Sequence, residues 1–178
     1  MIVAETPRLR LRQLLGSDAP FIIELLNDPE FIRNVGDRGV RTLADAQRYI
    51  ETGPAASYAR YGFGLYVVEL RDAAVAAGLC GLLHRDTHPD VEIGFALLPR
   101  HRGNGYTMEA ARAALRLGVE SLRLTRIVAI TAPDNLPSIR RLETLGLNFA
   151  GLVRFGEDGR ESRLYVLECV DHDTSAAC

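Results

Sequence analysis

A short glycine-containing turn at residues 100–105 has the residue types and spacing that bind phosphate. It reads RHRGNG and is followed, from Thr107 onward, by apolar residues at helical spacing. The first N–H groups of a helix lack internal partners and lie at the positive end of the helix dipole, so they attract anionic oxygens. Glycine lets the backbone approach such oxygens closely. The segment therefore predicts a phosphate site, although an ordinary tight turn carries similar glycines.

Two commoner phosphate-binding motifs do not fit this turn. A dinucleotide-binding fingerprint needs a third glycine where this chain has Met108, and a Walker loop needs a lysine. The chain contains no lysine, because all 21 of its basic residues are arginine. That absence also excludes chemistry through a lysine Schiff base, such as that of pyridoxal phosphate.

Arg100, Gly103 and Gly105 match the pattern Gln/Arg-x-x-Gly-x-Gly/Ala. Further matches follow in order along the chain: EIGF at 92–95, GY at 105–106, EAA at 109–111, NLPSI at 135–139 and LETLGL at 142–147. In this order and at these spacings, residues 5–170 resemble the GNAT superfamily of N-acetyltransferases, in particular the branch that acetylates ribosomal-protein N-termini. Arg102 and Met108 depart from that branch, where an aromatic residue and a hydroxyl residue are frequent.

The resemblance implies transfer of an acetyl group from acetyl-CoA to a primary amine. Backbone N–H groups of the turn would hold the pyrophosphate, and the end of the preceding strand would hold the pantetheine arm. The arginine side chains of the turn are equally consistent with solvated positions. The cofactor-binding residues implied by the resemblance are Phe95, Ala96, Leu97, Arg100, Arg102, Gly103, Asn104, Gly105, Tyr106, Thr107, Asn135 and Ser138.

The catalytic groups are also implied by the resemblance. Glu92 is the candidate base, acting through a water molecule, and is equally consistent with a solvated or salt-bridged strand carboxylate. A β-bulge near Phe95 or Ala96 would aim an N–H group at the thioester oxygen. Ser138 or, more weakly, Tyr165 would protonate the leaving thiolate. Helix capping by Asn135 and Ser138, and a core position for Tyr165, are the structural alternatives.

Composition excludes several other classes of protein. A net charge of −2 and a pI of about 6.1 argue against a nucleic-acid-binding protein. No apolar run reaches membrane-spanning length, and mean hydropathy is +0.01. Cys80, Cys169 and Cys178 have no metal-ligand spacing, nor do the histidines, so we expect no metal. The odd cysteine count fits a reducing cytoplasm, with Cys80 and Cys169 as buried, inert thiols.

The pattern of elements predicts one N-acetyltransferase domain over residues 1–178, with a core at about 5–170 and a frayed tail at 171–178. Strands are expected at 8–12, 63–70, 76–83, 91–97, 127–131, 149–155 and 162–170. Thr42 and Asp45 resemble a capping box, and Gly53 and Pro54 should end the helix that follows. The GNAT fold implied is α/β (α+β): one mixed, mostly antiparallel sheet of about seven strands. Its central parallel strands four and five are splayed, with helices on both faces.

The favoured hypothesis is a cytoplasmic N-acetyltransferase working by direct attack in a ternary complex. Its acceptor is either a protein N-terminus or a small amine, bound between residues 27–40 and the hairpin at 154–160. Glu157 and Asp158 would attract a cationic amine or form a solvated turn. The alternative is a catalytically silent acyl-CoA-binding regulatory or interaction module. Homodimers are common in such folds, and no nucleic acid or membrane partner is expected.

Overall fold

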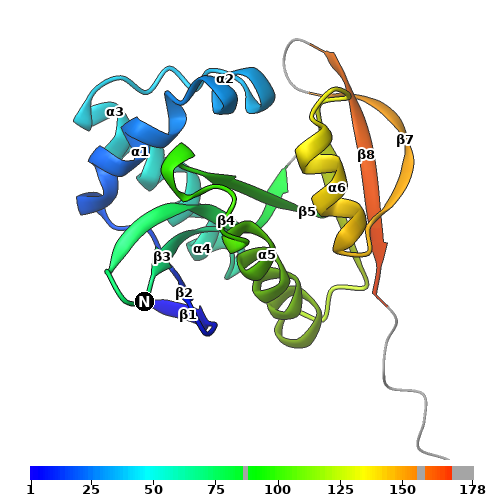
Figure 1. Ribbon diagram of the computed structural model, residues 1–178, viewed down its shortest axis with the longest axis horizontal. Coiled ribbons are helices and arrows are strands. Elements are labelled where there is room, and N and C mark those ends of the chain that lie inside the picture. The colour runs from blue at the N-terminus through cyan, green and yellow to red at the C-terminus, as the bar shows by residue number, and fades with distance from the viewer. Residues whose placement is uncertain (86–87, 156–158, 170–178) are drawn as a thin grey trace, which may run out of the picture.

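The computed structural model describes residues 1–85, 88–155 and 159–169, arranged around one eight-stranded mixed sheet (Figure 1). The strand order is β1-β2-β3-β4-β5-β6-β8-β7. The strands are β1 (Ile2–Glu5), β2 (Leu9–Arg12), β3 (Leu65–Leu70), β4 (Val75–Arg85), β5 (His88–Leu97), β6 (Arg126–Thr131), β7 (Asn148–Phe155) and β8 (Arg160–Glu168). The α-helices are α1 (Ala19–Leu26), α2 (Pro29–Val35), α3 (Leu43–Ile50), α4 (Ala56–Tyr61), α5 (Tyr106–Arg116) and α6 (Leu136–Thr144).

The pairing of the central strands confirms the predicted splayed arrangement. The strands β5 and β6 are parallel, and their register is Val91 with Ile127 and Glu92 with Val128. Beyond Glu92 the two strands diverge, while every other neighbouring pair is antiparallel. The sheet has one strand more than expected because β1 pairs with β2 at the N-terminus. That strand is too short for alternation to be visible in the sequence.

The β-bulge expected near Phe95 or Ala96 is not in the ladder between β4 and β5. The register there is unbroken from Gly78 with Leu97 to Leu83 with Glu92. The parallel pairing of β5 with β6 stops after two residue pairs. The edge of β5 beyond Glu92 is therefore open because β6 diverges from it, and not because of a bulge.

Local sequence signals set the helix boundaries, with one correction. Thr42 and Asp45 form the expected reciprocal capping box at the start of α3. Gly53 and Pro54 were expected to end this helix, which was wrong. The chain instead passes through a π turn at Glu51–Ala55 directly into α4. This wider turn accommodates Pro54, whose ring nitrogen has no hydrogen to donate.

Apolar side chains cover both faces of the sheet. One core cluster joins the sheet to α5 and α6, and the alanines of α5 are almost wholly buried in it. Figure 1 shows α5 lying against the sheet. The other cluster joins the opposite face to α1, α2 and α3. Because the two layers are anchored separately, α2 and α6 stand on either side of the point where β5 and β6 diverge.

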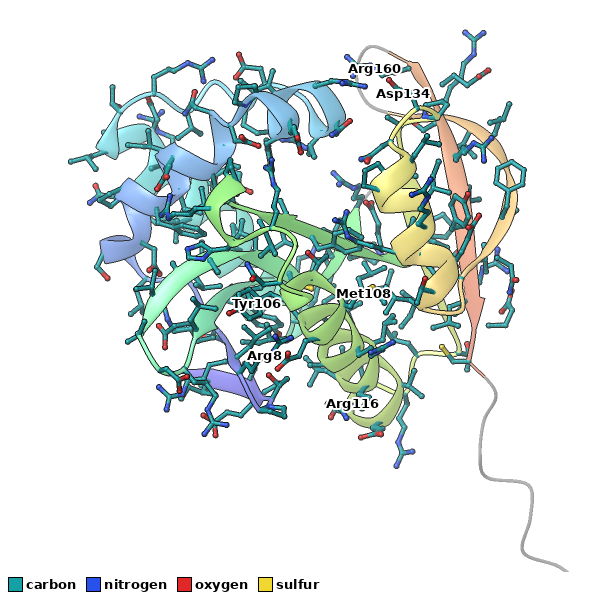
Figure 2. The ribbon with its side chains drawn as sticks, in the orientation of Figure 1. Arg8, Tyr106, Met108, Arg116, Asp134 and Arg160 are labelled. Carbon is teal, nitrogen blue, oxygen red and sulfur yellow. The ribbon has the colours of Figure 1, made fainter. Side chains whose placement is uncertain are left out.

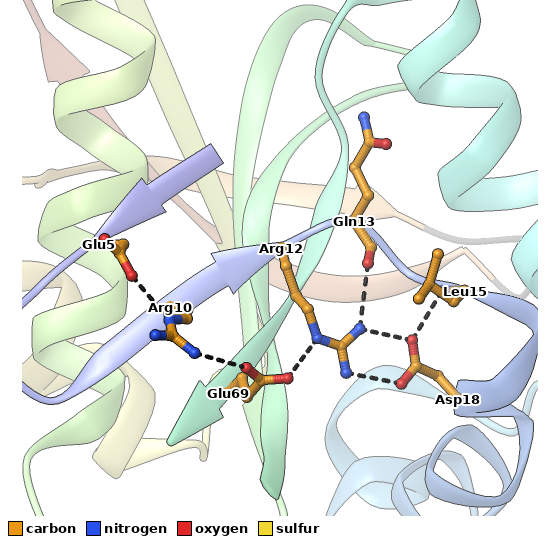
Figure 3. A network of polar contacts seen from close by, with 7 residues as sticks. All are labelled: Glu5, Arg10, Arg12, Gln13, Leu15, Asp18 and Glu69. Atoms are coloured by element: carbon orange, nitrogen blue, oxygen red, sulfur yellow. Dashed lines mark hydrogen bonds and ion pairs between the residues drawn. The ribbon is translucent and has the colours of Figure 1, made fainter. Parts of the chain in front are cut away.

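A buried ion network ties the N-terminal strands to α1 (Figure 3). Arg12 donates to both oxygens of Asp18, at 2.8 and 2.9 Å, and its Nε donates to Glu69 at 2.6 Å. Burial by itself raises the pKa of Asp18, but the hydrogen bonds from Arg12 and from the Leu15 N–H outweigh it and hold that pKa below its ordinary value. The network locks the strand β2 to β3 and to the start of the first helical layer.

Within the described residues, no helix is both long and apolar enough to cross a bilayer. The predicted frayed tail at 171–178, which includes Cys178, lies outside the described residues, as do Glu157 and Asp158. Cys80 is a buried free thiol whose pKa burial raises to about 12, as expected of an inert cysteine. Cys169 is only half-buried, so the expectation of full burial was wrong for it.

Candidate active site

A cleft of about 380 Å³ opens where β5 and β6 diverge, between α2 on one side and α6 on the other. Its wall includes seven residues that the sequence assigned to cofactor binding: Phe95, Ala96, Leu97, Arg102, Thr107, Asn135 and Ser138. These residues come from the end of β5, the turn that follows it, the start of α5 and the start of α6. The fold brings them together because each of these element ends borders the same gap in the sheet.

The glycine turn has the conformation that its sequence requires. Gly103 and Gly105 both have φ of +79°, a region that side chains disfavour. A Cβ atom built on Gly103 meets no atom within 4 Å, so this residue faces open space. The side chain of Asn104 folds back onto the Arg102 carbonyl oxygen at 3.1 Å. At Gly103 the turn therefore presents its backbone without a covering side chain, whereas Arg8 lies 3.4 Å from the Cβ position of Gly105. The first N–H groups of α5 have no partner within the helix.

Arg8 braces this turn from the beginning of the chain, a role that the sequence did not indicate. Its guanidinium donates to the Asn104 carbonyl oxygen at 3.0 Å and to Glu109 at 2.7 Å. Its Cζ lies 4.8 Å from the centre of the Tyr106 ring, and both residues are labelled in Figure 2. Ninety-six residues separate Arg8 from Asn104, so no local pattern could have identified the contact.

The two arginines of the turn are bound to carboxylates. Arg100 forms an ion pair with Glu24 of α1. Arg102 forms ion pairs with Asp28 at 2.5 Å and Glu30 at 2.8 Å, and its Nε donates to the Leu97 carbonyl oxygen at 2.9 Å. Arg100 is solvent-exposed, as one of the two alternatives predicted, but it is ion-paired as well, whereas Arg102 is partly buried. Phosphate binding by these side chains stays a prediction. Arg102 joins the start of α2 to the end of β5.

The edge of β5 that faces the gap carries the backbone groups of Phe95. The Leu98 N–H donates to the Ala77 carbonyl oxygen at 2.9 Å, so the backbone groups of Leu98 point toward β4. Backbone groups alternate between the two edges of a strand, so those of Phe95 and Leu97 point away from β4. The bond from Arg102 to the Leu97 carbonyl agrees with this assignment. The Phe95 amide therefore lies at the open edge, although no bulge places it there.

Asn135 and Ser138 hold the start of α6 against the cleft. The Asn135 side chain accepts a hydrogen bond from the Ser138 backbone N–H at 3.2 Å and so caps the helix. This cap uses the backbone of Ser138 and leaves its hydroxyl for other contacts. Capping and a place in the cleft wall are thus compatible for Asn135.

Two of the predicted catalytic residues are not in the cleft wall. Glu92 is 8% exposed and pairs with Arg85 at 2.7 Å, beside β4. Tyr165 is fully buried, and its ring packs edge-on against Phe149 at 5.7 Å. Tyr165 is therefore a core residue. Glu92 is on the same strand as Phe95, three residues before it.

The cleft is crossed at its outer end by side chains from three distant segments. Arg33 of α2 donates to Asp134, just before α6, at 2.9 Å, and Arg160 of β8 donates to the Arg33 carbonyl oxygen at 3.3 Å. Figure 2 labels Asp134 and Arg160 near the end of α2. The hydrogen bond from Arg33 holds the pKa of Asp134 below its ordinary value. The two regions expected to form an acceptor pocket therefore meet here.

Within the described residues, no group of three or more histidine, cysteine or acidic side chains could hold a metal ion. The described histidine side chains near the site play other roles. His84 packs against the ring of Tyr61 at 4.9 Å between centroids. Burial and the neighbouring Arg100 lower the pKa of His101.

Relatives and solved structures resemble this chain over most of its length. YoaA and YjdG of Bacillus subtilis (strain 168), both described as uncharacterised N-acetyltransferases, are each 30% identical over 153 residues. The aligned part covers 85% of this chain and 86% of YoaA, and 82% of this chain and 89% of YjdG. An acetyltransferase from Agrobacterium tumefaciens has a TM-score of 0.80 at 26% identity, covering 94% of this chain and 95% of that one.

Lower identity still preserves the fold. RimL, an alpha-N-protein acetyltransferase solved in complex with coenzyme A, has a TM-score of 0.81 at 16% identity, with 94% of this chain and 98% of RimL covered. The family model of the acetyltransferase (GNAT) domain matches residues 8–148, which include β5, the glycine turn and α6. On this match the chain belongs to the GNAT family of acetyltransferases.

Proposed function

We propose that this acyltransferase moves an acetyl group from acetyl-CoA to a primary amine by direct attack in a ternary complex. The observation that supports this most is the meeting, in one cleft, of the two residues that flank the glycine turn, Arg102 and Thr107, with the open edge of β5 and the start of α6. Together these elements offer donors for a pyrophosphate, an amide for an oxyanion and a hydroxyl for a leaving thiolate.

The N–H groups around Gly103 and Gly105, and those at the start of α5, would hold the pyrophosphate. The open edge of β5 would bind the pantetheine arm as an added strand does, through backbone groups of Phe95. The Phe95 N–H would also donate to the thioester carbonyl oxygen. Its hydrogen bond strengthens as the oxygen becomes an anion, which lowers the barrier to attack.

Glu92 and Ser138 would move the protons. An α-amine with a pKa of about 8 is largely protonated at pH 7, so it must lose a proton before or during attack. Glu92 would accept that proton through a water molecule. As the carbon–sulfur bond breaks, the Ser138 hydroxyl would protonate the departing thiolate. Tyr165 is left out of this scheme because its side chain is fully buried.

The acceptor would enter between α2 and the β7–β8 hairpin. Residues from Glu30 to Val35 line that side of the cleft, and Arg160 reaches the end of α2. Protein N-termini are one candidate class, on the resemblance to RimL; small amines are the other. Both present a primary amine, which is the chemistry that the proposed scheme requires.

A catalytically silent acyl-CoA-binding module is the second candidate. The observation that favours it is the engagement of Glu92 by Arg85, outside the cleft wall. Such a module would bind acetyl-CoA through the same turn and release no thiol with any amine.

Thermal unfolding with acetyl-CoA, coenzyme A and ATP, followed by a thiol-release assay, tests the proposal. A ligand that binds only the native state raises the unfolding midpoint by mass action. We expect a rise with acetyl-CoA and coenzyme A but not with ATP, and thiol release with peptides bearing free N-termini or with small amines. N-terminally blocked peptides serve as the control. Binding without thiol release from any amine would favour the silent module, and no binding would refute both.

A further inference from the structure

Three arginines line the cleft, and they differ in their partners. Arg33 is paired with Asp134, and Arg102 is paired with Asp28 and Glu30. The third, Arg141 of α6, is half-buried, and its guanidinium has no hydrogen bond or ion pair within the described residues. Among these three, Arg141 is therefore the cation whose charge is balanced by no carboxylate that the structure describes.

The position of Arg141 on α6 explains why it faces the cleft. It lies three residues after Ser138, so the two side chains share one face of the helix. Ile139 and Leu142 occupy the adjoining face of the helix, which is buried. Arg140 is exposed and does not line the cleft. The adjacent residues Arg140 and Arg141 thus differ in position, because only Arg141 lines the cleft.

Thr107, in the first turn of α5, lines the same cleft as Arg141. A ligand lying on the amides at the start of α5 would have Arg141 on the wall formed by α6. An unpaired guanidinium in a partly enclosed site strongly favours an anionic ligand, since its planar donors match phosphate oxygens.

We propose that Arg141 binds a phosphate group of coenzyme A from the α6 side, in the role that the sequence suggested for Arg100 and Arg102. This proposal rests on the proposed function. It adds a cofactor-binding residue outside the glycine turn. It also assigns Arg102 to holding α2 in place rather than to binding the ligand.

The test compares Arg141→Met with Arg140→Met, which removes the same charge from the same helix one residue away. Calorimetry would measure binding of coenzyme A, dephospho-coenzyme A, which lacks the 3′-phosphate, and S-acetyl-pantetheine, which lacks all phosphates. We expect Arg141→Met to weaken coenzyme A binding about ten- to a hundredfold, as for the loss of a charge-assisted hydrogen bond. We expect Arg140→Met to leave it within about twofold, since it lies outside the cleft.

The three ligands separate the possible outcomes. Loss of affinity for both coenzyme A and its dephospho form assigns Arg141 to the pyrophosphate; loss for coenzyme A alone assigns it to the 3′-phosphate. Equal loss for S-acetyl-pantetheine, or equal effects of the two variants, overturns the proposal. Arg141→Lys should recover part of the affinity because it keeps the charge. If the wild type does not bind coenzyme A, the proposed function fails first and this proposal with it.

Discussion

The glycine turn works through backbone conformation rather than through side chains. Gly103 and Gly105 adopt the same positive φ, and Gly103 faces open space. The arginines around them are engaged with Glu24, Asp28 and Glu30. In the proposed function, amide donors are thus the chief means by which this turn would hold a pyrophosphate.

Replacement of Gly103 by glutamate should abolish coenzyme A binding. The new side chain places a carboxylate in the space where a phosphate would lie, and both groups are anions. Gly62→Glu is the matched control, because Gly62 also has φ of +79° with no atom near its Cβ position, yet it ends α4. Calorimetric titration with coenzyme A measures the effect. Binding that survives in Gly103→Glu would remove the turn from the cofactor site.

Ser138→Ala should slow turnover more than it weakens binding. The helix cap uses the Ser138 backbone N–H, so the substitution preserves it and removes only the hydroxyl. Loss of general acid catalysis costs about a hundredfold or more in kcat. Asn135→Ala is the contrasting variant, since it removes the cap and costs about 0.5–2 kcal/mol of stability. A change in Kd for acetyl-CoA with unchanged kcat would limit Ser138 to holding the cofactor.

At the scale of elements, the short helix α2 forms one wall of the cleft and is held at both ends by arginine pairs. Asp28 caps it and binds Arg102, while Arg33 in its last turn binds Asp134. The first pair is largely buried, and the second is exposed, with each side chain 67% accessible. Exposed pairs contribute little, about 0–1 kcal/mol, so the outer end of α2 is the easier one to release.

Asp134→Asn should loosen α2 without unfolding the protein. The substitution removes the charge that holds Arg33, and we expect faster amide hydrogen exchange over Pro29–Val35. The unfolding midpoint should hardly move, because the pair is exposed. Glu168→Gln, which breaks an exposed ion pair with Arg126 at 2.6 Å, is the control. Exchange in α2 equal to that of this control would mean that the pair does not restrain the helix.

For the molecule as a whole, the buried network of Arg12 links acid sensitivity to the assembly of the N-terminal half. The pKa of Asp18 in the folded protein lies below its ordinary value, so the folded state binds the proton less readily than the unfolded chain. The stabilisation is therefore present above about pH 4 and is lost as the pH falls through the folded pKa.

Asp18→Asn should cost about 1–3 kcal/mol of unfolding free energy at pH 7, because it removes a buried charged partner of Arg12. The difference from the wild type should begin to shrink below about pH 4, where Asp18 becomes protonated in the unfolded chain, and it should vanish once the pH has fallen through the lower pKa of Asp18 in the folded protein. Denaturant unfolding at a series of pH values measures this. Glu5→Gln, at an exposed end of the same network, should change stability far less. A difference that stays constant with pH would contradict the assignment.

The local elements could be predicted where short-range chemistry determines them. The capping box of Thr42 and Asp45 and the helix after the glycine turn are set by residues a few positions apart. The break expected at Gly53 and Pro54 failed because the chain continues from α3 through a π turn, in which Pro54 is buried, into α4. The strand Ile2–Glu5 is stabilised by pairing with β2, which no pattern within four residues can reveal.

By itself, the sequence determined the family, the glycine turn and seven of the residues that line the cleft, because these depend on residue types at fixed short spacings. Only the tertiary structure decided which arginine side chains are ion-paired and which have no carboxylate partner among the described residues. Arg100 and Arg102 lie in the turn yet are bound by carboxylates of other elements, and Arg8 braces the turn across ninety-six residues. Arg141 has no hydrogen-bond or ion-pair partner for its guanidinium in the part of the chain that the structure describes. Ion pairing depends on distances in space between elements far apart in the chain, and those distances exist only once the chain has folded.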